Sequence, residues 1–307
     1  MKTRRSRTPL LAVAAASVIA LVAAGCGDGN GSGAAGGSPN SRPPAQQAGP
    51  VQDIAAQVPS GIRDKGTLTV AADATYAPNE FIAADGNTVV GMDADLAKAL
   101  GQVLDLKVRI VNATFDTIIP GLASGKYDLG MSSFTDTKER EQTVDFVTYF
   151  KAGTSFYVKT NGPDIRSLAD LCGHTVAAEK GTTQQADAES QAKKCSSAGD
   201  PKVTVQVYND QNAVNLALSS GRAQVAMADS PVAAYQVKQS NGTFKVTGSP
   251  YATAPYGIAI AKDSGLVDPV LAAVKHLIAD GTYTQILDRW GVRGGAITNP
   301  AVNAAVS

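Results

Sequence analysis

Two hydrophobic patterns alternate along most of this 307-residue chain, and this alternation most restricts its fold. Short runs rich in β-branched residues, such as residues 67–72 and 106–111, are typical of strands. Between them, residues 93–104 repeat apolar side chains at helical spacing, which predicts an amphipathic helix. Strands that alternate with helices form parallel sheets with crossover helices, so the sequence predicts an α/β fold.

The alternation occurs twice, in two units of about a hundred residues each. The first unit continues through a predicted helix at 115–124 and a strand at 127–132. The strands predicted after it are 155–159, 175–179, 202–208, 224–228 and 256–261, and the helices are 183–194, 213–220, one opened by Pro231, 267–279 and 283–290. Ligands of open α/β sheets bind at the carboxyl ends of the strands. Two such units facing each other would therefore form a binding cleft.

The first 25 residues predict an export signal. Four basic residues precede an apolar run at 10–24 that is shorter than the ~20 residues that span a bilayer. The run ends in Val22-Ala23-Ala24-Gly25-Cys26, which resembles the lipobox of bacterial lipoproteins. This resemblance implies that Cys26 carries lipid. An ordinary cleaved signal remains the alternative, and the export route, general or twin-arginine, stays open.

Residues 26–58 are predicted to be a flexible linker, because their first part is mostly Gly, Ser, Ala, Pro and Asn and cannot bury a core. The whole chain has a formal net charge of zero, and loss of the four signal cations leaves about −4. A mildly acidic body with no basic stripe argues against nucleic-acid binding. The chain has two histidines, His174 and His276, and neither has ligand spacing with the cysteines. We therefore expect no metal, no cofactor and no catalysis.

Cys172 and Cys195 remain as a pair if Cys26 is lipidated. Export makes a disulfide between them plausible, and two buried free thiols are the alternative. A crosslink closing a loop of this size would stabilise the fold by about 3 kcal/mol.

The string Gly91-Met92-Asp93-Ala94-Asp95-Leu96 resembles the signature of the family-3 extracellular solute-binding proteins of ABC transporters. The likeness extends from about Gly66 to Gly291, and several further strings follow in the family's order. These strings lie at 73–78, 115–122, 132–140, 144–146, 181–184, 228–229, 280–283 and 289–291.

The resemblance implies a two-lobed, periplasmic-binding-protein-like fold of type II with a cleft between the lobes. Lobe 1 would comprise residues 59–151 and 254–295, lobe 2 residues 152–253, and a C-terminal tail residues 296–307. Crossover strands are expected near 152–157 and 251–256. The resemblance also implies a disulfide in lobe 2, an ABC permease as partner, and a monomer anchored outside the cytoplasm by lipid.

The resemblance assigns roles to eight residues around an α-amino acid. Arg140 would bind the carboxylate through two parallel charge-assisted bonds. Thr183, at a predicted helix start, would add donors to the same carboxylate, although it could simply cap the helix. Asp229 would bind the ammonium group. Ser133 and Thr135 would add hydrogen bonds to the ammonium and carboxylate groups, and the alternative is that they are plain turn residues.

Three further residues would contact the ligand's side chain. Tyr76 and Phe115 would sandwich it, unless they are core aromatics. Asp73 would reach its distal end, or else cap its own loop. Asn79 and Glu80 are expected to add polarity near the rim, which favours a polar or cationic ligand such as glutamine, glutamate, arginine or lysine. A sensory lipoprotein and a dehydratase on the same scaffold are the rival functions.

Overall fold

The computed structural model describes residues 49–306. The predicted signal, the lipid-bearing Cys26 and most of the predicted linker lie outside the described residues. Residues 49–306 form one compact unit, in which two lobes share a single sheet.

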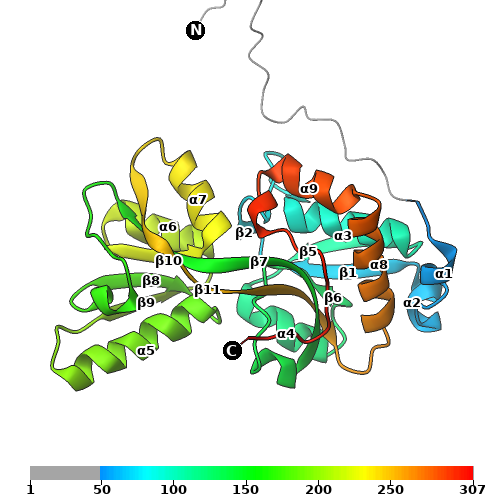
Figure 1. Ribbon diagram of the computed structural model, residues 1–307, viewed down its shortest axis with the longest axis horizontal. Coiled ribbons are helices and arrows are strands. Elements are labelled where there is room, and N and C mark those ends of the chain that lie inside the picture. Colours follow the sequence, from blue (N-terminus) through cyan, green and yellow to red (C-terminus); the bar gives the residue numbers. More distant parts are fainter. Residues whose placement is uncertain (1–48, 307) are drawn as a thin grey trace, which may run out of the picture. The chain divides into compact units, whose positions relative to one another are not determined.

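The sheet has eight strands in the order β5-β1-β6-β11-β7-β10-β8-β9 (Figure 1). In that order the strands are β5 (Lys107–Asn112), β1 (Thr67–Ala72), β6 (Leu129–Gly130), β11 (Phe244–Ala261), β7 (Val144–Lys159), β10 (Val225–Asp229), β8 (Thr175–Glu179) and β9 (Thr204–Tyr208). β1 pairs in parallel with β5 and β6, and β8 pairs in parallel with β9 and β10. Each lobe is therefore a parallel α/β unit, as the alternating pattern predicts.

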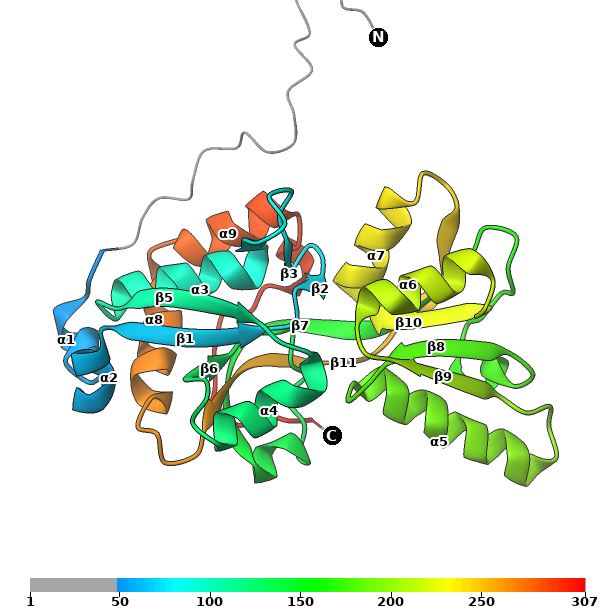
Figure 2. The ribbon, with the colours of Figure 1, turned by 180° about the vertical axis from the view of Figure 1, so that it is seen from behind.

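β7 and β11 join the two lobes (Figure 2). They run antiparallel, from the pair Val144 and Ala261 in lobe 1 to the pair Lys159 and Phe244 in lobe 2. The sequence predicted only their outer parts, at 155–159 and 256–261, as separate strands. The register shifts between Thr247 and Gly257, close to the expected crossovers. The two-lobed α/β fold with two crossover strands is confirmed.

Helices cover both faces of the sheet in each lobe (Figure 1). Those of lobe 1 are α1 (Gln52–Ala55), α2 (Ser60–Lys65), α3 (Met92–Val103), α4 (Phe115–Ala123), α8 (Val267–Ala279) and α9 (Thr282–Trp290). Those of lobe 2 are α5 (Thr183–Ala198), α6 (Gln211–Ser220) and α7 (Ser230–Gln239). Three short 3-10 helices are η1 (Arg140–Gln142), η2 (Leu168–Leu171) and η3 (Arg293–Gly295). Leu96, Leu100 and Val103, the apolar face of α3, are fully buried, as their helical spacing predicts.

A second, three-stranded sheet was not predicted. Its strands are β2 (Thr75–Tyr76), β3 (Glu80–Ile82) and β4 (Val89–Val90). Each is too short to show an alternating pattern, and the antiparallel pairing is what defines them. This small sheet places Tyr76 beside the functional site described below.

Residues predicted as the end of the linker and as the C-terminal tail both pack against the body. The Val51 N–H donates to the Val103 carbonyl, and Val58 is 2% exposed in the core of lobe 1, so residues 51–58 belong to the body and not to the linker. At the other end, Val302 forms a β-bridge with Val147, and the Asn303 side chain accepts from the Phe146 N–H. The tail therefore packs along β7.

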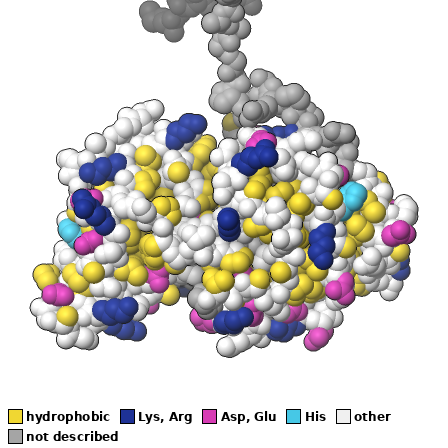
Figure 3. Space-filling model, viewed as in Figure 1, with side chains coloured by type: hydrophobic (Ala, Val, Ile, Leu, Met, Phe, Trp, Pro, Cys, Tyr) yellow, Lys and Arg dark blue, Asp and Glu magenta, His cyan; other side chains and the backbone are white. Residues whose placement is uncertain are grey.

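Side chains of both charge signs are interspersed over the face shown in Figure 3. Within residues 49–306, no helix combines the length and the apolar character needed to cross a membrane.

Cys172 and Cys195 form a disulfide with a Cα–Cα distance of 5.8 Å. It ties the end of η2 to α5, and Cys195 is buried in the core of lobe 2. The prediction of an oxidised pair is confirmed, and the free-thiol alternative is wrong.

We expect the double variant Cys172→Ser/Cys195→Ser to lose about 3 kcal/mol of unfolding free energy, because the unfolded chain regains the entropy of an open loop. Urea denaturation followed by circular dichroism measures this loss. Wild-type protein in reductant is the control and should match the variant. An unchanged unfolding midpoint would contradict the expectation.

Candidate functional site

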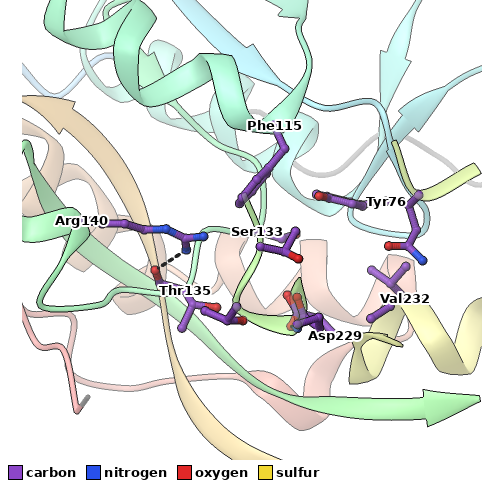
Figure 4. A pocket seen from close by; sticks show the side chains of 12 residues that line it. Tyr76, Phe115, Ser133, Thr135, Arg140, Asp229 and Val232 are labelled. Atoms are coloured by element: carbon purple, nitrogen blue, oxygen red, sulfur yellow. Dashed lines mark hydrogen bonds between the residues drawn. The ribbon is translucent and has the colours of Figure 1, made fainter. Parts of the chain in front are cut away.

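A small cavity of about 20 Å³ lies between the two lobes (Figure 4). Lobe 1 lines it with Tyr76, Phe115, Ser133, Thr135 and Arg140, and lobe 2 with Thr182, Thr183, Gln184, Gln211, Ala228, Asp229 and Val232. Seven of the eight predicted ligand-binding residues are therefore together, and Asp73 is not among the lining residues. A volume of this size holds about one water, so an amino acid requires the lobes to move apart.

Arg140 reaches both lobes from η1. Its Nη1 donates to the Thr135 carbonyl at 2.7 Å, and its Nη2 donates across the cleft to the Gly181 carbonyl at 3.0 Å. The guanidinium also lies over the rings of Phe115 and Phe134, at 5.2 and 5.4 Å. Burial lowers the pKa of Arg140, and the negative charge of Asp229 opposes that shift. A guanidinium held in this way presents its planar donors to the cavity.

Asp229 ends β10 on the opposite lobe, where α7 begins. Its carboxylate accepts from the Tyr256 hydroxyl at 2.6 Å and from Gln184 Nε2 at 2.7 Å. Burial raises the pKa of Asp229 to about 6, and these hydrogen bonds oppose the rise. Because Tyr256 belongs to β11, a strand that joins the lobes, the carboxylate is positioned partly by the hinge.

Thr183 is the first residue of α5, and Thr182 is the cap. The Thr182 hydroxyl accepts from the Gln185 N–H at 3.2 Å, so the alternative role of Thr183 as a helix cap is wrong. The N–H of a first helical residue has no acceptor within the helix. Since Thr183 lines the cavity, this end of α5 offers backbone donors and a positive dipole end to an anion.

Ser133 is fixed by polar groups buried behind it. Its N–H donates to Asp93 at 3.0 Å, and its hydroxyl donates to Glu80 at 3.2 Å and accepts from Asn79 at 2.9 Å. Asn79 and Glu80 are both 0% exposed, so the prediction that they lie near the rim is wrong. Glu80 begins β3, and the Asn79 carbonyl before it accepts from the Asp93 N–H of α3 at 2.8 Å. A Cβ on Gly91 would lie 2.1 Å from the Asn79 carbonyl oxygen, so this packing requires glycine there.

Tyr76 and Phe115 contact each other edge to face, with ring centroids 5.8 Å apart. Phe115 also stacks on Phe134 at 4.4 Å. In this arrangement the two predicted sandwich rings touch, so a ligand side chain between them requires the rings to separate. Their roles in ligand binding stay predictions.

Asp73 is 2% exposed, and its carboxylate is used within its own lobe. It accepts from the Thr75 hydroxyl at 2.7 Å and from the Phe115 N–H at 3.0 Å, which matches the alternative role of a loop cap. Thr75 in turn accepts from the Gln211 N–H of lobe 2 at 3.1 Å. Burial raises the pKa of Asp73 to about 6. The carboxylate therefore lies at the lobe boundary, although it does not line the cavity.

Sequence reasoning missed several lining residues. Gln184 directly follows Thr183, and Ala228 directly precedes Asp229. Their position beside predicted site residues could therefore have identified them. Gln211 and Val232 lie at or near the starts of α6 and α7, and nothing in the local sequence distinguishes them. Within residues 49–306, no group of three or more His, Cys, Asp or Glu side chains is arranged to hold a metal ion.

Comparison with known proteins decides the family. Residues 68–293 match the model of the bacterial extracellular solute-binding proteins, family 3, which spans both lobes. The chain belongs to this family. The resemblance drawn from the sequence strings is confirmed.

The relatives of this family-3 protein include arginine-binding proteins. It is 32% identical over 255 residues to the arginine-binding protein ArgT of Corynebacterium glutamicum, covering 83% of this chain and 84% of that protein. It is 32% identical over 222 residues to the ABC transporter arginine-binding protein 1 of Escherichia coli, covering 71% and 87%. A solved ancestral arginine-binding protein bound to arginine has a TM-score of 0.69 and 37% identity, covering 73% of this chain and 98% of its own.

The buried Glu80 predicts how the stability of this protein changes with pH. Its pKa is raised well above the usual value, first by burial and then by the negative charge of Asp93. Folded Glu80 therefore keeps its proton at pH values where Glu80 of the unfolded chain is ionised. The contribution of this group to the free energy of unfolding is fully present below the usual carboxyl pKa. It is lost as the pH rises toward the folded pKa, at no more than about 1.4 kcal/mol per pH unit.

We expect the melting temperature of the wild type to fall more steeply between about pH 5 and about pH 8 than that of Glu80→Gln. Circular dichroism melts at several pH values measure this difference. Glu189→Gln, which changes an exposed carboxylate, is the control and should follow the wild type. Parallel curves for the wild type and Glu80→Gln would count against the assignment.

Proposed function

We propose that this protein is the substrate-binding component of an ABC importer and captures a polar or cationic L-amino acid outside the cytoplasm. The observation that carries the proposal is the pairing of charges around one cavity. Arg140 approaches it from lobe 1, and Asp229 approaches it from lobe 2. A zwitterion placed between them would meet a cation at its carboxylate and an anion at its ammonium group.

The surrounding groups suit the same ligand. The start of α5 at Thr183 adds donors for the carboxylate. Ser133 and Thr135 lie between the two charged residues in Figure 4 and can complete both polar shells. Tyr76 and Phe115 supply apolar surface for a side chain, and Asp73 lies beyond them. The arginine-binding relatives support the polar or cationic ligand class.

Hinge closure would form the site, because half of it lies on each lobe. β7 and β11 are the two strands that cross between the lobes, and rotation about them would open the cleft. Closure then buries the ligand between Arg140 and Asp229, and the closed form is what a permease would recognise. The cavity is lined by neither histidine nor cysteine among the described residues.

Removing the guanidinium tests this proposal. A thermal-shift screen of the twenty amino acids first identifies the ligand, which at about a hundred times its Kd stabilises the fold by about 2.7 kcal/mol. We expect Arg140→Ala to weaken its binding in calorimetry by about 2–5 kcal/mol, because a buried carboxylate is left without its partner.

Arg166→Ala is the matched control, since this exposed arginine pairs with Asp164 away from the cavity and should bind as the wild type does. Near-normal binding by Arg140→Ala would remove Arg140 from the site. Stabilisation by leucine-like compounds alone would overturn the polar-ligand assignment.

We also propose that lipid on Cys26 anchors the mature protein as a monomer on the outer side of the membrane. Two acyl chains hold a protein stably on a bilayer. Cys26→Ala, expressed in a bacterium that lipidates such signals, should therefore move the protein from the membrane pellet to the soluble fraction. Continued pelleting of the variant would contradict lipidation.

A further inference from the structure

The C-terminal tail lies beyond the stretch that the family model matches, which ends at residue 293, so the family match gives the tail no role. Figure 1 shows the tail, in red, running along lobe 1 beside β7. The Thr148 N–H donates to the Ala301 carbonyl at 2.9 Å, and the Asn303 N–H donates to the Phe146 carbonyl at 3.0 Å. The tail is therefore tied by backbone hydrogen bonds to the lobe 1 part of a strand that joins the lobes.

The end of the tail then reaches two acids that flank Arg140 in the chain. The Ala304 N–H donates to Asp136 Oδ2 at 2.7 Å, and the Ala305 N–H donates to Glu141 Oε1 at 3.1 Å. Asp136 precedes Arg140 by four residues, and Glu141 directly follows it. The tail therefore holds both ends of the short segment that carries Arg140.

The contact between the tail and Asp136 is buried. Asp136 is 0% exposed, and its other carboxylate oxygen, Oδ1, has no hydrogen-bond partner within residues 49–306. Burial raises the pKa of Asp136 to about 6, and the hydrogen bond from the Ala304 N–H opposes that rise. Without this donor a buried carboxylate would be left with no hydrogen bond, which is unfavourable. The conformation of Asp136 therefore depends on the tail.

Arg140 depends for its position on the same segment. Its Nη1 donates to the carbonyl of Thr135, which directly precedes Asp136. Its backbone N–H donates to the Thr137 hydroxyl at 3.3 Å, and Thr137 directly follows Asp136. A shift of Asp136 would therefore move an acceptor of the guanidinium and the residue on which η1 begins to turn.

We infer that tail residues 301–305 are a positioning element that holds Arg140 in the orientation in which it binds the carboxylate of the ligand. This inference rests on the proposed function, in which Arg140 binds that group. None of the described tail residues lines the cavity, so the tail acts through Asp136 and Glu141. A guanidinium binds a carboxylate through two parallel bonds in one plane, and a small displacement weakens both.

This role differs from a general contribution of the tail to stability. A tail that only stabilised lobe 1 would change the binding of every ligand alike when it is released. A tail that positions Arg140 changes the recognition of the α-carboxylate and leaves the contacts of the rest of the ligand in place. The affinity for an amino acid relative to its α-amide therefore distinguishes the two roles.

Ala304→Pro tests the inference, because it removes the N–H that donates to Asp136 from an otherwise complete chain. The probes are L-arginine and L-argininamide, in which a neutral amide replaces the α-carboxylate; if the screen above identifies another amino acid, that amino acid and its α-amide are used. Calorimetry of the mature chain should show that Ala304→Pro weakens the binding of L-arginine by about tenfold or more and that of L-argininamide much less. The ratio of the two affinities should therefore fall.

A second variant releases the tail at another residue. Asn303 has a φ of 50°, and its side chain accepts from the Phe146 N–H at 2.8 Å and donates to Asp145 at 2.9 Å. Asn303→Ala removes both side-chain bonds and disfavours this left-handed backbone, so it should lower the same ratio. Val306→Pro is the matched control, because it introduces the same ring at a residue that is 70% exposed, and it should keep the wild-type ratio.

The outcomes separate this inference from the proposed function. An unchanged ratio in both Ala304→Pro and Asn303→Ala, with the amino acid still bound, would overturn the positioning role of the tail and leave amino-acid binding intact. An equal loss of affinity for both probes would also overturn that role, because the effect would not be specific to the carboxylate. A wild type that binds no amino acid would overturn both proposals. Melting curves of the ligand-free variants check that each is folded at the temperature of the titration.

Discussion

β7 and β11 pair antiparallel from lobe 1 into lobe 2, and every other feature of the site depends on this pairing. Each lobe folds as a parallel sheet with its own helices, and neither contains a complete binding site. The paired strands fix which edges of the two sheets face each other. Tyr256 of β11 also hydrogen-bonds Asp229, so the hinge itself positions one of the two charges. The strands that join the lobes therefore also position a charged residue of the site.

The second constraint is the burial of charge. Arg140 is held by two carbonyl groups and two aromatic rings, and Asp229 is held by a hydroxyl and an amide. These partners are neutral, so each charge is oriented without being cancelled. Neutral dipoles keep a charge available for a ligand, whereas a direct ion pair between Arg140 and Asp229 would have to break first. Both charges therefore remain uncancelled at the cavity, which the proposed binding of a zwitterion requires.

The acids of the Gly91 to Leu96 string illustrate how a sequence motif can be structural. Asp93 accepts from the Ser133 N–H and the Tyr149 hydroxyl, and Asp95 accepts from Trp290 Nε1 and pairs with Arg289. Neither side chain lines the cavity. Asp93 acts on the site through Ser133, and Asp95 ties α3 to α9 at the far end of the chain. The two acids of the motif that identified the family therefore support lobe 1 from outside the cavity lining.

Local sequence determined much of this protein, because hydrophobic periodicity and turn residues act over a few neighbouring positions. It determined the alternation of strands and helices, including the helix over residues 267–279 and the strand over residues 67–72. It also contains the short family strings in which Arg140 and Asp229 lie. It did not determine the inward turn of Asn79 and Glu80, the short sheet around Tyr76, or the joining of the inner halves of β7 and β11, since these depend on partners far away in the chain. Tertiary structure alone brought Arg140 and Asp229 to one cavity, because two charged residues far apart in the chain meet only where the lobes face each other. The sequence determines which residues are charged, and the packing of the two lobes determines which of these residues lie close together.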